Sequence, residues 1–153
     1  MSAPGDDLDR IMAVMASAFD PAFGEAWNRR QVEDALLIGN CHYALLDGFG
    51  AVPAEGAEAA GFFLSRTGFE EEELLLLAVD PRFRRRGIGR ALLDQFAARA
   101  RERGARRLLL EMRRGNPAEL LYRNFGFVAI GERPKYYRSP DGERIDAITF
   151  SCE

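Results

Sequence analysis

The sequence predicts an α/β fold in which helices cover both faces of a sheet of mixed strand direction. One observation is the apolar run Leu74–Val79, which has no polar face and is typical of a strand covered on both sides. A second is the order of helical and extended patterns along the chain, which reads α, α, β, β, β, α, β, α, β, β. The length of 153 residues fits a single domain spanning 1–153.

Two helices are expected first. Apolar residues at helical spacing predict a helix over Leu8–Phe19, with an aspartate at position 6 or 7 as its cap. A second helix should begin after Asn28, because Asn28 with Gln31 resembles a capping box. We expect this helix to run to about Ile38 and to end at Gly39.

Three strands should follow. Short strands are predicted over His42–Leu46 and Ala60–Arg66, joined by a loop at 48–61 that is rich in Gly, Ala, Pro and Glu. The central strand is expected over Glu73–Val79. Asp80-Pro81 ends it, because proline cannot donate a hydrogen bond to a sheet ladder.

The next helix is predicted over Ile88–Arg103, where apolar residues recur every four positions, and Gly104 should terminate it. A strand is expected over Arg107–Met112. Asn116 is predicted to cap the following helix, with a proline at its first position and a glutamate at its third. Gly126 should end that helix.

The C-terminal part predicts a pair of strands. Phe127–Ile130 has the pattern of the start of a strand, and Asp141-Gly142 is a hairpin turn signal. Arg144–Ser151 is expected to return beside it as the last strand.

Composition excludes several classes of protein. The net charge of −3 and pI of about 5.4 give no support for nucleic-acid binding. No apolar run is long enough to span a membrane, and the N-terminus lacks a signal-peptide pattern, so a cytoplasmic location is expected. Cys41 and Cys152 are interpreted as free thiols, although one disulfide is conceivable. His42 has no ligand at metal-binding spacing, so no metal is expected.

The most informative stretch is the loop from Arg84 to Gly89, which follows the central strand and opens directly onto a helix. Its glycines lack Cβ, which allows backbone to approach a ligand closely. The first N–H groups of the helix and its dipole favour an anion, and Arg84, Arg85 and Arg86 add positive charge. The loop therefore predicts a phosphate or pyrophosphate site. The alternative is a tight turn with a solvated basic run.

Two common phosphate-binding motifs do not match this loop. A P-loop requires GxxxxGK followed by Ser or Thr, and the chain has none. A dinucleotide-binding fingerprint requires a third glycine, where this chain has Leu92. A nucleotide-binding domain is therefore disfavoured.

The pattern Arg84-x-x-Gly87-x-Gly89, preceded by AVDP and followed by RALL, resembles the acetyl-CoA motif of the GNAT N-acetyltransferase superfamily. The stretch Leu108–Phe127 is similar to the second half of that fold. Tyr136–Phe150 and Trp27 are similar to the RimI-like branch, the ribosomal-protein-alanine N-acetyltransferases. The resemblance implies a GNAT acyl-CoA N-acyltransferase fold with a mixed, mostly antiparallel sheet flanked by helices.

The resemblance also implies acetyl-CoA as co-substrate. Backbone N–H groups of Leu77 and Val79 would hold the pantetheine arm and the thioester carbonyl, as in an oxyanion hole. The amides from Arg84 to Arg90 would cradle the pyrophosphate. The residues expected at the cofactor are Leu77, Ala78, Val79, Arg84, Arg85, Arg86, Gly87, Ile88, Gly89, Arg90, Asn116 and Tyr122. Asn116 lies six positions before Tyr122, one fewer than is usual in the family, which leaves its cofactor contact open.

Two side chains are expected to be catalytic by this resemblance. Glu111 would be the general base that takes a proton from the incoming ammonium, and Tyr122 would protonate the departing CoA thiolate. At pH 7, deprotonation costs about 1.4 kcal/mol for an α-amine and about 4.6 kcal/mol for lysine. The alternatives are a structural carboxylate at Glu111 and a core aromatic at Tyr122.

The sequence therefore predicts direct acetyl transfer, in a ternary complex, to the N-terminal α-amine of a protein, with a ribosomal protein among the candidate partners. A small amine (a polyamine, an amino sugar or an amino acid) is the alternative acceptor, and a non-catalytic acyl-CoA-binding module is the alternative class. The acidic run Glu70–Glu73 fits a solvated strand entrance or a surface that attracts a cationic peptide. Tyr136 and Tyr137 either border the acceptor cleft or pack on the sheet.

Overall fold

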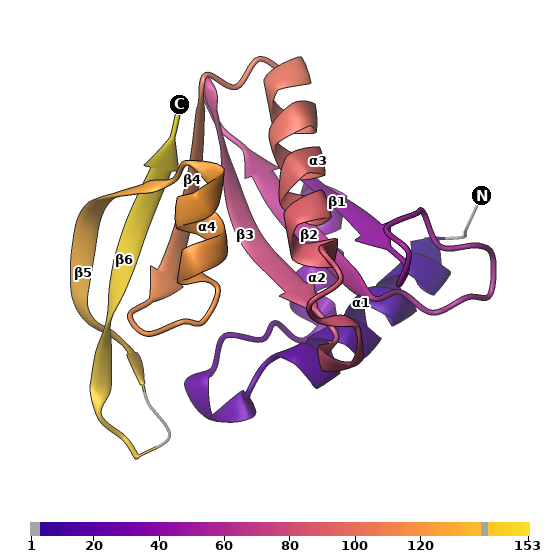
Figure 1. The fold of residues 1–153 in the computed structure, drawn as a ribbon, viewed down its shortest axis with the longest axis horizontal. Helices are drawn as coiled ribbons and strands as arrows, with labels where there is room; N and C mark the ends of the chain where they lie inside the picture. The colour runs from indigo at the N-terminus through magenta and orange to yellow at the C-terminus, as the bar shows by residue number, and fades with distance from the viewer. Residues whose placement is uncertain (1–3, 139–140) are drawn as a thin grey trace.

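A six-stranded sheet forms the centre of the molecule, with strand order β1-β2-β3-β4-β6-β5 (Figure 1). The computed structural model describes residues 4–138 and 141–153. The elements in chain order are α1 (Pro4–Ala18), η1 (Pro21–Phe23), α2 (Arg29–Ile38), β1 (Cys41–Leu46), β2 (Gly61–Thr67), β3 (Glu71–Val79), η2 (Pro81–Phe83), α3 (Ile88–Glu102), β4 (Arg107–Arg113), α4 (Glu119–Phe125), β5 (Val128–Arg138) and β6 (Arg144–Cys152). Only β3 and β4 pair in parallel, so the predicted mixed, mostly antiparallel sheet is confirmed.

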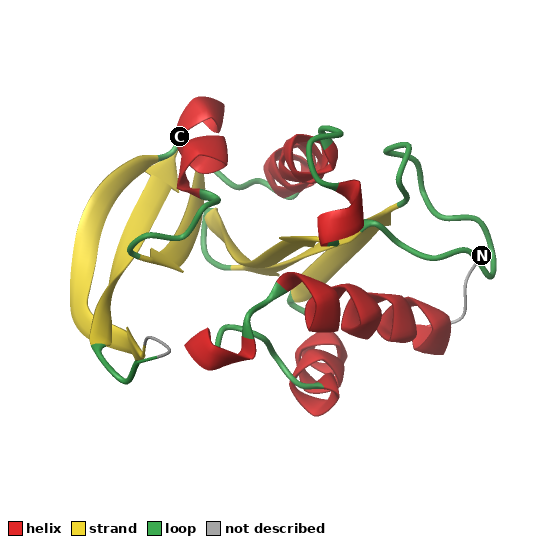
Figure 2. Cartoon of the chain, turned by 60° about the horizontal axis from the view of Figure 1, so that its bottom comes forward, coloured by secondary structure: helices red, strands yellow, loops and turns green. Residues whose placement is uncertain are grey.

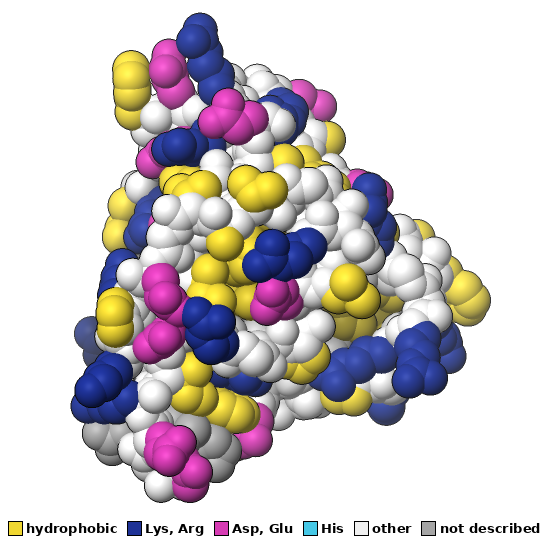
Figure 3. Space-filling view, turned by 60° about the vertical axis from the view of Figure 1, so that its left-hand side comes forward, with side chains coloured by type: hydrophobic (Ala, Val, Ile, Leu, Met, Phe, Trp, Pro, Cys, Tyr) yellow, Lys and Arg dark blue, Asp and Glu magenta, His cyan; other side chains and the backbone are white. Residues whose placement is uncertain are grey.

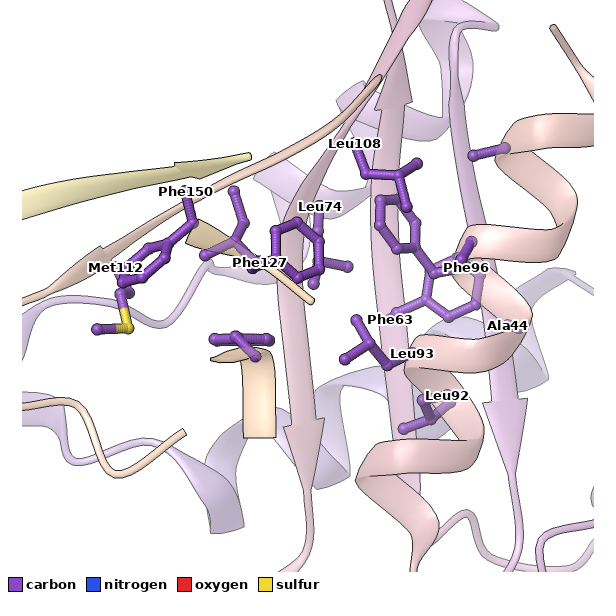
Figure 4. Packing of buried hydrophobic residues seen from close by; sticks show 14 of the residues in the cluster. Ala44, Phe63, Leu74, Leu92, Leu93, Phe96, Leu108, Met112, Phe127 and Phe150 are labelled. Atoms are coloured by element: carbon purple, nitrogen blue, oxygen red, sulfur yellow. The ribbon is translucent and has the colours of Figure 1, made fainter. Parts of the chain in front are cut away.

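Helices cover both faces of the sheet, as the sequence predicts. Figure 2 shows α1 and α2 on one face and α3 and α4 on the other. Under α3, Leu92 and Phe96 pack against Phe63 of β2 and Leu108 of β4 (Figure 4). Residues of α1 and α2, among them Ile11, form a second core on the opposite face. No helix of the described residues is long and apolar enough to cross a membrane.

The second helix matches its prediction at both ends. The Asn28 side chain accepts from the Gln31 N–H, and the Asn28 N–H donates to the Gln31 side chain, both at 2.8 Å. Gly39 ends the helix in the left-handed conformation, with φ of 94°. Both ends of α2 are thus fixed by local interactions that the sequence displays directly.

The first helix begins earlier than predicted. It starts at Pro4, so Asp6 and Asp7 lie inside its first turn and neither is its cap. Carboxylates are favoured there because they face the positive end of the helix dipole. Asp7 also accepts hydrogen bonds from Arg10 and Tyr43, which the sequence pattern did not reveal.

The predicted capping role of Asn116 is wrong in position, because α4 begins at Glu119 and its N-cap is Ala118. The Asn116 Oδ1 atom accepts from the Ala118 N–H at 2.8 Å. An asparagine that bonds the backbone two residues later forms a turn of its own, and here that turn precedes the helix. Gly126 ends α4, as expected.

The central strand contains a bulge that sends its apolar residues into both cores. Leu64 pairs with Leu76 but Ser65 pairs with Leu74, so Leu75 is an extra residue on β3. Leu74 therefore enters the core beneath α3, while Leu76 enters the core beneath α1. Because both faces of β3 are covered by these cores, the run has no polar face.

The same strand separates from β4 along half of its length. Glu71–Leu74 pairs with Arg107–Leu110, and the pairing stops there. Figure 1 shows β3 and β4 diverging toward the end of β3 at Val79. A gap therefore opens in the sheet beside the last residues of β3, and we refer to it as the β3–β4 gap.

Candidate active site

The β3–β4 gap exposes hydrogen-bond donors of the backbone. The Asp80 N–H donates to the Ala60 carbonyl at 2.7 Å, on the β2 side of β3. Because successive N–H groups of a strand point to opposite edges, Ala78 also faces β2, whereas Leu77 and Val79 face the gap. Two N–H groups at fixed spacing can bind a carbonyl oxygen there.

The loop after β3 leads directly to an uncapped helix. Asp80 accepts from the Arg82 N–H at 2.9 Å, and Gly87 adopts a left-handed conformation with φ of 78°. Gly87 is the N-cap of α3 and offers no side-chain hydrogen bond. The first N–H groups of α3, from Ile88 onward, are therefore available to an anion.

The glycine at position 89 serves packing rather than backbone conformation. A Cβ there would lie 3.2 Å from the Leu121 side chain and 3.7 Å from that of Val79. Gly89 thus lets α3 lie close to α4 and to the end of β3. Gly87, by contrast, has open space around it and is required for its positive φ.

Three basic side chains lie in the loop just before this helix. Arg84, Arg85 and Arg86 are exposed and form none of the ion pairs found among residues 4–138 and 141–153. Arg86 lies over the Phe83 ring at 5.3 Å. Arg90 pairs with an aspartate one turn along α3. The site therefore has the free positive charge that a diphosphate requires.

Glu111 lies on β4 and faces the side of the sheet that α1 and α2 cover, because its neighbours in sequence enter the opposite core. Its side chain is 19% exposed. Thr149, its register partner on β6, donates to Oε2 at 3.4 Å. Arg133 of β5 places Nη2 3.4 Å from the same oxygen. This carboxylate is therefore largely buried but already has a cationic neighbour.

Tyr122 lies on α4, on the other face of the sheet. Its ring is buried and packs edge-on against Phe127, with centroids 6.1 Å apart. Within the described residues, its hydroxyl has no hydrogen bond to a side chain. The hydroxyl oxygen is not fully buried either, so it keeps contact with solvent. Burial, and then the charge of Glu25, raise the pKa of Tyr122 above its ordinary value. The phenol stays protonated at neutral pH.

A third feature, the pair of Glu25 and Arg113, was not apparent from the sequence. Arg113 Nε lies 3.0 Å from Glu25 Oε1, and its guanidinium stacks on Phe23 at 3.7 Å. Asn116 donates from Nδ2 to the other oxygen of Glu25 at 3.4 Å. The pair joins the segment after η1 to the end of β4. In this segment, the family resemblance pointed to Trp27 and not to Glu25.

Glu25 and Glu111 both face Tyr137 of β5. Burial first, and then these two carboxylates, raise the pKa of Tyr137 to about 12. The charge of Glu25 therefore acts on both Tyr122 and Tyr137. Figure 3 shows this side of the molecule, formed by β5, β6 and α4, where acidic and basic side chains intermingle with hydrophobic ones.

Other residues noted in the sequence lie elsewhere. The acidic run Glu70–Glu73 lies at the end of β3 that pairs with β4, away from Val79, and Glu72 is buried against Arg103. His42 bonds to a threonine of β2, and both cysteines are free thiols. Two surface cavities of about 410 and 420 Å³ lie beside β1, and their linings include none of the predicted site residues.

Comparison with known proteins supports the family resemblance. Residues 40–129 match the model of the acetyltransferase (GNAT) domain. The chain is 33% identical over 98 residues to the [ribosomal protein bS18]-alanine N-acetyltransferase of Haemophilus influenzae, covering 64% of this chain and 67% of that one. Its Escherichia coli counterpart is 38% identical over 98 residues, covering 63% and 66%. The matches thus span about two thirds of the length of these relatives.

A solved structure shows the same fold. The crystal structure of the ribosomal-protein-S18-alanine N-acetyltransferase from Escherichia coli superposes with a TM-score of 0.81 at 29% identity. The superposition covers 99% of this chain and 90% of that one. A crystal structure of a ribosomal-protein-alanine N-acetyltransferase from Brucella melitensis, at 21% identity and a TM-score of 0.75, shares the fold.

Proposed function

The chain belongs to the family of GNAT acetyltransferase domains, and on this premise we propose that it transfers the acetyl group of acetyl-CoA to the N-terminal α-amine of a protein. The observation on which the proposal depends is the β3–β4 gap, with free backbone donors beside the uncapped start of α3. Acetyl-CoA has a group for each feature. Its thioester carbonyl can accept hydrogen bonds in the gap, and its diphosphate can bind at the start of α3.

The cofactor would be held mainly by backbone. Diphosphate oxygens would accept from the N–H groups at the start of α3, with Arg84, Arg85 and Arg86 supplying positive charge. The N–H groups of Leu77 and Val79 would face the thioester carbonyl and stabilise the negative charge that develops on its oxygen. Asn116 has both ends of its amide hydrogen-bonded within the protein, so its contact with the cofactor stays a prediction.

Glu111 would serve as the base for the acceptor amine. The ammonium must lose a proton before its lone pair can attack, and for an α-amine this costs only about 1.4 kcal/mol at pH 7. A largely buried carboxylate at the edge of the gap can take that proton directly or through one water. The amine nitrogen then forms the bond to the acetyl carbon as the carbon–sulfur bond breaks.

Tyr122 would return a proton to the departing sulfur. The raised pKa keeps its hydroxyl protonated until the thiolate appears. The surroundings that disfavour a buried phenolate also disfavour a thiolate anion nearby, so proton transfer between the two is less unfavourable than their ordinary pKa values suggest. Together, Glu111 and Tyr122 would act from opposite faces of the sheet on the same gap.

The relatives' names, bS18-alanine N-acetyltransferases, favour a protein N-terminus over a small amine. The test is release of CoA thiol with peptides beginning in alanine, serine or methionine, alongside a polyamine, an amino sugar and an amino acid. We expect mono-acetylation at the α-amine of the alanine peptide, located by mass spectrometry, and none on its Nα-formylated form. Turnover with small amines alone would contradict the acceptor, and no thiol release with any amine would contradict the activity.

A further inference from the structure

The guanidinium of Arg133 lies beside the carboxylate of Glu111, where the acceptor's ammonium would bind. Arg133 Nη2 lies 3.4 Å from Glu111 Oε2, while Oε1 has no hydrogen bond within the described part of the chain. The acceptor arrives as a cation, and two cations beside one carboxylate repel each other. The acceptor's ammonium and the guanidinium of Arg133 therefore compete for this carboxylate.

The contact between Arg133 and Glu111 is built differently from the fixed ion pairs of this protein. Arg103 binds the buried Glu72 through two atoms at 2.9 and 2.6 Å. The shortest contact of Arg133 with Glu111, at 3.4 Å, is longer than the usual range of about 2.7–2.9 Å for charged pairs, and the Arg133 side chain is 57% exposed. Little free energy is therefore lost when this contact breaks.

In the same position, Arg133 also contacts an aromatic ring. Its guanidinium lies 4.5 Å from the ring centre of Tyr136, which is half exposed and packs edge-on against Tyr137. An arginine over a tyrosine ring gains cation–π stabilisation independently of a carboxylate. Arg133 can therefore release Glu111 without losing all of its interactions.

We propose that Arg133 is the resident counter-ion of Glu111 and that the ammonium of the acceptor displaces it. This rests on the proposed function of Glu111 as the base. Arg133 is a positioning residue: it keeps the carboxylate paired in the empty site, and it competes with every cationic acceptor. Its removal strengthens acceptor binding and leaves the chemical step unchanged.

The experiment measures kcat and KM for the alanine-starting peptide at saturating acetyl-CoA and low salt. In Arg133→Gln, we expect KM to fall about two- to five-fold, which is the range for an exposed ion pair, with kcat within two-fold of wild type. Arg133→Lys should restore the wild-type KM, because it restores the charge. Arg144→Gln is the matched control, since it removes one exposed arginine of the adjacent strand that has no contact with Glu111.

A binding cycle shows whether the effect acts through Glu111. With CoA present, calorimetry should give a lower peptide Kd for Arg133→Gln in the wild-type background and no change in the Glu111→Gln background. An unchanged or higher KM in Arg133→Gln, or an equal fall in Arg144→Gln, overturns the proposal. If wild type acetylates the peptide, such results overturn only this inference. If wild type acetylates no peptide, the proposed function fails and the inference fails with it.

Discussion

The guanidinium of Arg113 lies 3.0 Å from the carboxylate of Glu25, a residue 88 positions earlier, and both side chains are only 13% exposed. This pair fastens the segment between α1 and α2 to the end of β4, two residues beyond Glu111. It therefore defines one wall of the region where the acceptor would enter.

Breaking the Glu25–Arg113 pair should destabilise the fold. Arg113→Met leaves the carboxylate of Glu25 nearly buried without its cation, and we expect the free energy of unfolding to fall by about 3 kcal/mol. Glu25→Gln should cost less, because Asn116 and the amide can still bond. Urea unfolding of both variants and of the double variant forms a thermodynamic cycle. Simple additivity of the two losses would show that the pair is not coupled.

Tyr122→Phe should lower kcat by about 10²–10⁴, the usual contribution of a general acid. The ring and its packing on Phe127 are retained, so the melting temperature and the Kd for acetyl-CoA should not change. Stopped-flow thiol release and calorimetry provide the two readouts. Tyr136→Phe, which alters an exposed tyrosine, is the control for loss of a hydroxyl. Turnover equal to wild type would remove Tyr122 from the mechanism.

The buried carboxylate of Glu72 should make stability sensitive to acid. Burial alone opposes its ionisation, but hydrogen bonds from Arg103 and Ser65 outweigh that effect and lower the pKa of Glu72. A lowered folded-state pKa means that the stabilisation is present above the ordinary value of 4.5 and is lost as pH falls below it. The wild-type protein should therefore lose stability progressively in that acidic range.

Arg103→Met tests this account of Glu72. Without its cation the buried carboxylate is destabilising, so we expect a loss of about 3 kcal/mol at pH 7 that shrinks as the pH falls and Glu72 becomes protonated. Arg101→Met changes an exposed arginine of the same helix and is the control. The measurement is urea unfolding at several pH values from 3 to 7. A deficit of Arg103→Met relative to Arg101→Met that stayed the same from pH 7 to pH 3 would contradict the role of Arg103.

Tyr43 should affect how the free energy of unfolding changes at alkaline pH. Its hydroxyl donates to Asp7 Oδ2 at 2.6 Å, and burial together with Asp7 raises the pKa of Tyr43 to about 12. A raised folded-state pKa gives stabilisation that is complete below pH 10 and lost as pH rises toward 12. Tyr43→Phe should therefore lose about 1 kcal/mol at pH 8 and show a flatter decline above pH 10. Parallel curves for the two proteins would contradict this prediction.

Local sequence patterns predicted most of the elements because the relevant interactions are local. The capping box of α2 and the glycines that end α2 and α4 act within a few residues, and each lies where expected. The predicted starts of α1 and α4 were wrong for a related reason. An aspartate or asparagine near a helix start can occupy a cap, a first turn or a preceding turn, and the sequence does not choose among them.

By itself, the sequence determined the alternation of helices and strands, the buried central strand and the glycine-containing loop that opens onto α3, since each depends on residues adjacent along the chain. Only the tertiary structure decided how far β3 and β4 separate, and which charges meet beside the gap. Glu25 with Arg113, and Glu111 with Arg133, come from segments far apart in sequence. Their proximity follows from strand register and from the turn of the chain after η1, which no local pattern encodes.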